Sequence, residues 1–329
     1  MPRFSRPALL LASASMAVGV LTVPNAAYAA DTTTILSATQ MAAALKEVST
    51  ATATAVKTGW GGTMKVSLNG APGEAEFAVD PASGRAFFEF DIDRETGAGY
   101  AVEHKGSYDA LYSRAEFTAV KMMGRPTAKF VFTTNTKLDL DAWVEDNEPQ
   151  PAMMLNDDTR HTGTKTVHDD GSSTYEFENP TNAANTFEVS ASGVLEGLSV
   201  SYPPLLSQTL QYEYGPQTVT LPSAEQTVSR AALTKALAYV DMPAAVKGVA
   251  GRSATAVKKA AKGGTVKVAS LRKIAKSTTA AHNSASKVKV IAVTDITGGV
   301  RLTAKNPYTG QKVSYTIKAS GKKVVVKKA

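Results

Sequence analysis

The chain has 329 residues, of which 43% are hydrophobic and 20% are charged, a balance that allows ordinary cores and argues against general disorder. The sequence contains no cysteine, which excludes disulfides, thiolate metal sites, cysteine nucleophiles and a lipid-modified N-terminal cysteine. Because domains usually have about 100–200 residues, the length favours two of them.

The first 29 residues predict an export signal. Arg3 and Arg6 precede a mostly apolar run over residues 8–23, and residues 27–29 read Ala-Tyr-Ala, the small-x-small pattern that signal peptidase cleaves. The apolar run is shorter than the ~20 residues that cross a bilayer, which disfavours a membrane anchor. We therefore expect a secreted, extracytoplasmic bacterial protein that begins at Ala30 and is neither transmembrane nor lipidated.

The remaining chain divides into halves of opposite charge. Residues 31–225 hold 27 Asp and Glu against 13 Lys and Arg, a net of −14, whereas residues 226–329 hold 21 Lys and Arg against 2 Asp, a net of +19. Charge asymmetry of this size bears on partners and location more than on fold. We place the domain boundary there and predict an acidic domain over residues 30–225 and a basic domain over residues 226–329.

The acidic half predicts one helix followed by many strands. Ser37 and Thr39 can cap a helix that carries Met41, Leu45 and Val48. Apolar residues then alternate with charged ones, so each strand has an apolar and an acidic face, and turn sequences such as Asn69-Gly70 separate the strands. We expect roughly ten strands paired in chain order, among them residues 64–68, 75–79, 88–92, 175–177, 187–189, 198–202 and 210–214.

A methionine-rich segment interrupts the strands over residues 115–156. It contains Met122, Met123, Met153 and Met154. Methionine fills irregular gaps in cores and also suits adaptable apolar binding surfaces. The segment is therefore either a set of helices that cap one end of the sheet or a mobile lid over an apolar ligand.

The basic half predicts helices followed by a four-strand meander. Leu233, Leu237 and Val240 share one helical face over residues 230–240, and a second helix runs over residues 243–262 and a third over 269–275. Short strands follow near residues 288–293, 300–304, 313–317 and 324–326. The whole chain therefore predicts an α+β protein, in which a smaller basic α+β domain follows a large antiparallel one.

The end of the acidic half carries a family resemblance. Residues 193–195 read Gly-Val-Leu, residues 210–215 read Leu-Gln-Tyr-Glu-Tyr-Gly, and residues 219–222 read Val-Thr-Leu-Pro. With the leader, the single helix and the interrupted meander, residues 31–223 resemble the lipoprotein-carrier superfamily, which includes LolA-like and LppX/LprG-like proteins. The resemblance implies a helix-covered antiparallel β half-barrel whose concave face holds acyl chains. The chain departs from the LppX/LprG pattern in having no cysteine to lipidate and in its basic extension.

That implied fold defines a candidate ligand site. Burying an alkyl chain contributes about 0.8 kcal/mol per CH₂, so an unfilled concave face could hold a lipid or acylated molecule. The alternative is a solid core without a cavity. The candidate lining residues are Phe77, Val79, Phe88, Phe90 and Ile92 on the sheet and Met122, Met123, Met153 and Met154 at the mouth.

The basic half defines a candidate anion site. Its lysines are almost unopposed, and they are either a solvated surface, a contact to anionic phospholipid headgroups or wall polymers of the cell envelope, or a contact to the acidic half. Specific nucleic acid binding is disfavoured, because only Tyr239, Tyr308 and Tyr315 could stack on bases. The candidate residues are Lys258, Lys259, Lys262, Arg272, Lys273, Lys276, Lys322, Lys323, Lys327 and Lys328.

No motif in the sequence predicts an enzyme. Nucleophile elbows, phosphate loops and zinc motifs are missing, and His104, His161, His168 and His282 have no telling neighbours in sequence. We expect no catalysis, cofactor or metal, and leave the oligomeric state open. The favoured interpretation is an exported, non-enzymatic protein that binds an acylated or lipid ligand and is held at the envelope by its basic module. The alternative is an envelope-associated structural or adhesion protein that binds anionic wall polymers and has no lipid cavity.

Overall fold

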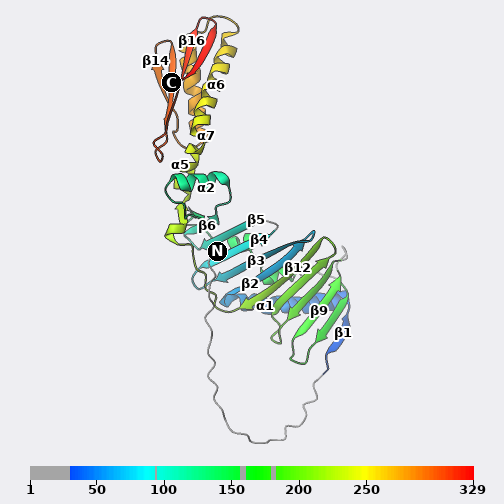
Figure 1. Ribbon diagram of the computed structural model, residues 1–329. Coiled ribbons are helices and arrows are strands. Elements are labelled where there is room, and N and C mark those ends of the chain that lie inside the picture. The colour runs from blue at the N-terminus through cyan, green and yellow to red at the C-terminus, as the bar shows by residue number, and fades with distance from the viewer. Residues whose placement is uncertain (1–29, 93–94, 156–160, 179–182) are drawn as a thin grey trace.

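The computed structural model describes residues 30–92, 95–155, 161–178 and 183–329, and it contains a 13-stranded sheet and a separate four-stranded sheet (Figure 1). The expected export signal, residues 1–29, lies outside the described residues. Among the described helices, none has both the length and the apolar character required to cross a membrane. The α+β class expected from the sequence is confirmed.

The large sheet is antiparallel except at one edge, where β13 runs parallel to β7. In spatial order its strands are β1 (Thr32–Leu36), β8 (Gly163–Val167), β9 (Ser173–Glu178), β10 (Ala184–Val189), β11 (Leu195–Tyr202), β12 (Leu206–Tyr214), β2 (Trp60–Leu68), β3 (Ala71–Asp80), β4 (Arg85–Ile92), β5 (Glu95–Val102), β6 (Gly106–Ala110), β7 (Phe130–Thr134) and β13 (Thr227–Ser229). Among the described strands, β1 and β13 are the edges of this sheet, and they do not pair to close it into a barrel.

The strands form two meanders, so the expectation of a single chain-ordered series is wrong. After β7 the chain passes through helices α3 and α4 to the far edge of the sheet, and β8 pairs with the N-terminal strand β1. The second meander then grows inward until β12 pairs with β2, from Tyr214 opposite Trp60 to Leu206 opposite Leu68. Both meanders run in the same direction across the sheet, and the helical crossover returns the chain to the opposite edge.

Helices cover the concave face of the large sheet. Helix α1 (Ala38–Ala55) begins with a capping box between Ser37 and Gln40, and a short 3-10 turn, η1 (Val56–Thr58), follows it. Its buried face packs on strands from both meanders, as the position of α1 below the sheet in Figure 1 shows. Helices α3 (Leu140–Asn147) and α4 (Pro151–Met154) extend this cover. The shared core contains Met41, Leu45, Val48, Trp60, Phe77, Leu140, Val144, Phe187, Leu195, Leu210 and Tyr212.

An extended segment, residues 215–226, crosses the opposite face of the sheet and includes a 3-10 turn, η2 (Ala224–Gln226). Arg85 of β4 donates a hydrogen bond from Nη1 to the carbonyl of Val219 at 3.4 Å, and the amide of Lys129, beside β7, donates to the carbonyl of Gln226 at 2.8 Å. This face of β4–β7 carries a cross-strand row of aromatic side chains. The row consists of Phe87, Tyr100, Tyr108 and Phe132.

The first residues of the basic half belong to the body of the large sheet. Strand β13 pairs with β7, and helix α5 (Arg230–Val240) packs against α2 (Arg114–Met122) through Leu233 and Ala236. Arg230 adds an ion pair with Asp109 of β6 at 2.9 Å. These contacts fix the start of the basic half to the acidic one.

The second sheet forms a module that projects from this junction (Figure 1). Helices α6 (Met242–Ala261) and α7 (Val268–Ala285) pack on one face of β14 (Ala292–Ile296), β15 (Gly299–Lys305), β16 (Lys312–Ser320) and β17 (Lys323–Lys328). The expected helices and meander are present. Helix α7 does not end near residue 275 as the sequence suggested, because Leu271, Ala275 and Thr279 continue one buried face.

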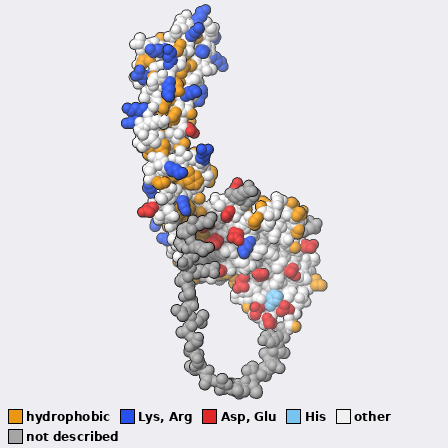
Figure 2. Space-filling model, in the orientation of Figure 1, with side chains coloured by type: hydrophobic (Ala, Val, Ile, Leu, Met, Phe, Trp, Pro, Cys, Tyr) orange, Lys and Arg blue, Asp and Glu red, His pale blue; other side chains and the backbone are white. Residues whose placement is uncertain are grey.

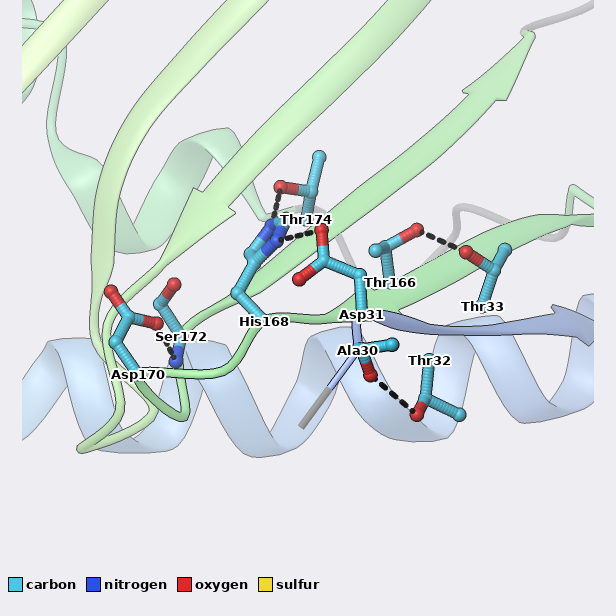
Figure 3. A network of polar contacts seen from close by, with 9 residues as sticks. All are labelled: Ala30, Asp31, Thr32, Thr33, Thr166, His168, Asp170, Ser172 and Thr174. Atoms are coloured by element: carbon cyan, nitrogen blue, oxygen red, sulfur yellow. Dashed lines mark hydrogen bonds and ion pairs between the residues drawn. The ribbon is translucent and has the colours of Figure 1, made fainter. Parts of the chain in front are cut away.

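A polar network holds the edge strand β1 (Figure 3). The imidazole of His168 lies 3.0 Å from Oδ2 of Asp31 through Nδ1 and 2.8 Å from Oγ1 of Thr174 through Nε2. In the adjacent turn, side-chain and backbone hydrogen bonds from Ser172 lower the pKa of Asp170. The carboxylate of Asp31, the imidazole of His168 and the hydroxyl of Thr174 thus form a chain of polar contacts at the edge of the sheet. This chain links β1 to β9.

One buried carboxyl group makes the stability of this fold depend on pH. Glu148, at the end of α3, is buried, and neither carboxylate oxygen has a hydrogen-bond partner among the described residues. Burial raises its pKa from 4.5 to about 9. Between these values the folded state holds a proton that the unfolded state releases, so stability is lost as pH rises.

We expect Glu148→Gln to remove this pH dependence. Since one pKa unit corresponds to about 1.4 kcal/mol, the variant should gain up to ~4 kcal/mol over the parent between pH 5.5 and 8.5. Urea unfolding at the two pH values measures the difference. Glu145→Gln, at an exposed position of the same helix, is the control. An equal effect of Glu148→Gln at both pH values would contradict the assignment.

Candidate functional site

The pairing between β5 and β6 stops short of the end of β5. The two strands are in register from Val102 opposite Gly106 to Gly99 opposite Asp109, whereas residues 95–98 pair only with β4 among the described strands. Past its pairing with β5, the chain of β6 continues through Leu111 toward helix α2. A slot therefore opens between the start of β5 and α2, with an unpaired strand edge on one side.

Two open cavities of about 530 Å³ and 700 Å³ meet at this slot. One extends to the outer side of β3–β5 and reaches Glu74 and Glu76, and the other extends to the concave side and reaches Phe88 and Trp143. The residues that line both are Phe90, Thr96, Gly97, Ala98, Ala110, Leu111 and Phe117. Because they share these walls, we treat the two cavities as one site and call it the slot.

Glycines in β5 make room for the aromatic walls of the slot. Gly97 lies opposite Phe90, and a β-carbon at Gly97 would stand 2.4 Å from the Phe90 ring. A β-carbon at Gly99 would stand 3.3 Å from the indole of Trp143. The two phenylalanines of β4, Phe88 and Phe90, lie 5.5 Å apart between ring centroids. The rings of Phe90 and Trp143 therefore lie directly on the glycine backbone of β5, where a larger residue would displace them.

The rim of the slot is acidic. On the outer side, Glu74 lies directly opposite Asp91 and Glu76 directly opposite Glu89, and like charges in such pairs repel. Lys129 is the single basic residue among those that line the two cavities. On the concave side the lining includes Glu95 and Asp109, of which Asp109 is paired with Arg230. The rim therefore attracts cations and repels anions.

The predicted lining residues of the sheet do not all lie at one site in the structure. Phe88 and Phe90 line the slot. Phe77 is buried in the filled core beneath α1, although it lies directly opposite Phe88 in the register of β3 and β4. Val79 packs in the same core and borders a separate cavity of about 630 Å³. Ile92, at the end of β4, lies against Gly73 of β3.

The four predicted methionines lie in two other places. Met122 and Met123, at the end of α2, pack against the cluster that joins α2 to α5, and the amide nitrogen of Asn306 in the second module lies 3.0 Å from the sulfur of Met122. Met153 and Met154 lie on α4, and Met153 borders the cavity that also contacts Val79. None of the four is among the residues that line the slot.

Sequence reasoning missed several walls of the slot. Phe117 is an exposed residue of α2, in which Ala119 and Val120 are buried, and Trp143 lies on α3. Leu111 and Phe130 complete the apolar wall. The sequence offered one signal for Phe117, a large aromatic residue at an exposed position of a short amphipathic helix. It could not show which surface this side chain would face, because that depends on where β6 ends.

The predicted anion-binding residues differ in their surroundings. Arg272 and Lys276 face Asp295, with Lys276 Nζ 3.0 Å from a carboxylate oxygen, and Arg272 also donates to the carbonyl of Ile296 at 2.9 Å. The other positions are exposed, on α6, α7 and the turn and ends of β17. They are Lys258, Lys259, Lys262, Lys273, Lys322, Lys323, Lys327 and Lys328.

Two pairs of carboxylates occur at alternate positions in the sequence, Asp91 with Asp93 and Asp139 with Asp141. Asp139 caps α3 by accepting a hydrogen bond from the amide of Ala142 at 3.1 Å, and Asp91 lies on the rim of the slot. Asp93, the partner of Asp91 in the sequence pattern, lies outside the described residues. Among the described residues, no three or more His, Asp or Glu side chains are grouped so that they could hold a metal ion.

Comparison with known proteins gives structural likenesses only. No family model matches the chain, and no curated protein matches its sequence. An uncharacterized conserved protein from Thermus thermophilus is 12% identical, with 57% of this chain and 98% of that chain covered and a TM-score of 0.28. Lipoprotein LppX from Mycobacterium tuberculosis is also 12% identical, with 55% and 98% covered and a TM-score of 0.30. Likenesses this low do not establish a family, and the lipoprotein-carrier resemblance stays a prediction.

Proposed function

We propose that this protein is a non-enzymatic carrier that holds the apolar chain of a lipid or acylated molecule in the slot between β5 and α2. The observation that carries the proposal is the slot itself, an opening with aromatic and aliphatic walls at an interruption in strand pairing. Ligand pockets usually have volumes of about 300–1,000 Å³ and mostly apolar linings with a few polar groups. Both cavities fall in that range.

The walls of the slot suit an alkyl chain. Phe88, Phe90, Leu111, Phe117 and Trp143 offer ring and methyl surfaces without buried charges. Each CH₂ group that leaves water contributes about 0.8 kcal/mol, so a chain of ten carbons would gain on the order of 8 kcal/mol before the costs of ordering it. The slot needs no chemistry beyond this burial to bind such a ligand.

The unpaired edge of β5 supplies polar contacts for the rest of the ligand. Residues 95–98 pair with β4 on one side, so the backbone amides and carbonyls that point to the other side face the slot. Such an edge can pair with the amide or hydroxyl groups of a ligand, as an added peptide strand does. An acyl chain joined to an amide or ester headgroup uses both features.

The acidic rim restricts the charge of the headgroup. Two pairs of carboxylates face each other on the outer side, Glu74 with Asp91 and Glu76 with Glu89. An anionic headgroup would add to the repulsion within these pairs. We propose that the preferred ligand has a neutral or cationic headgroup.

We propose further that the basic module holds the carrier at the anionic surface of the cell envelope. Lys and Arg are spread over the projecting module, while Asp and Glu gather on the body that contains the large sheet (Figure 2). Attraction to an anionic lipid surface is worth about 1 kcal/mol for each nearby Lys or Arg. The second candidate function, an envelope adhesion protein that binds only through this charge, shares the module and differs in leaving the slot empty.

Native mass spectrometry of the protein purified from its own envelope or medium distinguishes the two functions. A carrier should retain a bound species of discrete mass that organic extraction releases, and Phe88→Ser with Phe90→Ser should abolish it. Thermal unfolding checks that the double variant is folded. An apo mass with no extractable lipid, under conditions that preserve a known lipid complex, would favour the adhesion protein.

Phe117→Ser should weaken ligand binding while leaving the fold stable. The side chain is 41% exposed, so its loss costs little stability, but it removes one wall of the slot. We expect the affinity for a neutral fluorescent probe with an alkyl chain to fall about tenfold, as expected for roughly 1.4 kcal/mol of lost apolar contact. Leu205→Ser, 47% exposed in the turn between β11 and β12, is the control. Equal losses in both variants would contradict binding in the slot.

The acidic rim predicts discrimination between amphiphiles with equal chains. A monoacylglycerol or an alkylammonium should bind about tenfold more tightly than the fatty acid, because each carboxylate near an anion at the surface costs on the order of 1 kcal/mol. Competition against the fluorescent probe measures the ratio. Glu76→Gln with Glu89→Gln should reduce it, whereas Glu176→Gln with Glu178→Gln, at exposed positions of β9, should not. A preference for the fatty acid in the parent would contradict the proposal.

A further inference from the structure

The second sheet has one face packed and one face open. Val300, Leu302 and Ala304 of β15 are buried in the core that α6 and α7 complete, as is Ile317 of β16. Successive side chains of a strand point to opposite faces, and directly opposed residues of an antiparallel pair share a face. The residues between the buried ones therefore lie on the face away from the helices.

That open face is basic. In register, Arg301 lies opposite Thr316, which lies opposite Lys327, and Lys305 lies opposite Lys312. Hydroxyl groups of Thr303 and Ser314 lie between these rows, 3.5 Å apart. We call this surface the basic face, and its six charged residues are Arg301, Lys305, Lys312, Lys318, Lys323 and Lys327, all of them exposed.

The charges of the basic face are unopposed. Asp241 and Asp295 are the only acidic residues in residues 226–329, and Asp295 points to α7, where Lys276 and Arg272 engage it. Among the described residues, no ion pair involves any of the six cations. Lys305 and Lys312 even stand directly opposite each other, an arrangement that destabilises a sheet unless an anion lies between them.

We propose that the basic face binds a linear phosphate polymer of the cell wall, of the poly(polyol phosphate) type. This inference deepens, and rests on, the envelope attachment proposed above. Alternate residues of a strand are about 7 Å apart and neighbouring strands about 4.8 Å apart, so the cations form a grid on which successive phosphates of one chain bind together. The hydroxyl of Thr303 can rotate to donate a hydrogen bond to a phosphate oxygen, whereas that of Ser314 donates to the carbonyl of Leu302 at 3.1 Å.

A polymer fits this face better than a bilayer or a nucleic acid. Its apolar residues are Ala292, Ile296 and Val325, none of them a large exposed side chain that could insert among lipids. Tyr315 shares the packed face with Leu302, so no aromatic ring is available on the basic face to stack on bases. What remains is a flat array of cations and hydroxyls.

The test compares two sets of substitutions with the same change in charge. The face variant carries Arg301→Gln, Lys305→Gln, Lys312→Gln and Lys318→Gln in the full chain. The helix variant carries Lys235→Gln, Lys247→Gln, Arg252→Gln and Lys267→Gln, at exposed positions of α5 and α6 and at the N-cap of α7. Binding to poly(glycerol phosphate) is measured between about 50 and 200 mM NaCl, the range over which phosphate contacts lose most of their affinity, with circular dichroism as the check on folding.

We expect the face variant to bind about tenfold more weakly or worse and to show a shallower salt dependence, because fewer counterions are released, while the helix variant changes less than about threefold. Equal losses would show that net charge alone acts, and they would overturn the proposal. A third variant with Lys305→Arg, Lys312→Arg and Lys318→Arg should keep the parent affinity, and its loss would likewise overturn it.

Three further measurements separate the proposals. Phosphatidylglycerol vesicles present the same headgroup chemistry in a bilayer, and tighter binding to them than to the polymer at equal phosphate would overturn the polymer assignment. Occupancy of the slot by the neutral fluorescent probe should be unchanged in the face variant, so an empty slot counts against the carrier alone. Release of the face variant from whole cells, with the helix variant retained, supports envelope attachment through this face, and equal retention of both overturns it.

Discussion

The structure depends on how far the helices reach across the concave face of the large sheet. An apolar sheet face must be covered, and α1 covers the strands where the two meanders join, so that Phe77, Leu195, Leu210 and Tyr212 form a filled core. Helix α3 extends the cover only to Trp143, above Gly99 of β5. Beyond that point α2 and α5 cover only the end of the sheet around Val131 of β7, and the space between this end and α3 is the slot.

The pairing of β5 with β6 and the cover of the sheet by α3 end at the same place. The space left there by packing is the candidate site. β6 pairs with only the second half of β5, so the slot has a backbone edge as well as aromatic walls. The same region carries the opposed carboxylates of β3 and β4, whose repulsion is tolerable because they are exposed. Apolar contact, backbone hydrogen bonding and charge therefore act on a ligand from three sides.

Alternation along the strands and the apolar spacing after Ser37 were enough to predict the α+β class, a helix that carries Met41, Leu45 and Val48, and the aromatic side chains of β4 on the apolar face of the sheet. It was not enough to place the ligand site. Phe77 and Phe88 are directly opposed and chemically alike, yet one lies beneath α1 and the other borders the slot, because the position of a helix decides between them. Strand order failed for a related reason, since the crossover through α3 and α4 leaves no periodic signal. Among the basic residues, the sequence could not tell that Asp295 engages Arg272 and Lys276, or that the strands carry a separate unopposed array.

The separation of charge between the body and the projecting module has a consequence for orientation. Residues 31–225 carry −14 and residues 226–329 carry +19, and the packing of α5 on α2 joins the two parts through a buried cluster. The molecule is therefore a large electric dipole, on which the field of an anionic surface exerts a torque. That torque turns the second sheet toward such a surface and the large sheet away from it.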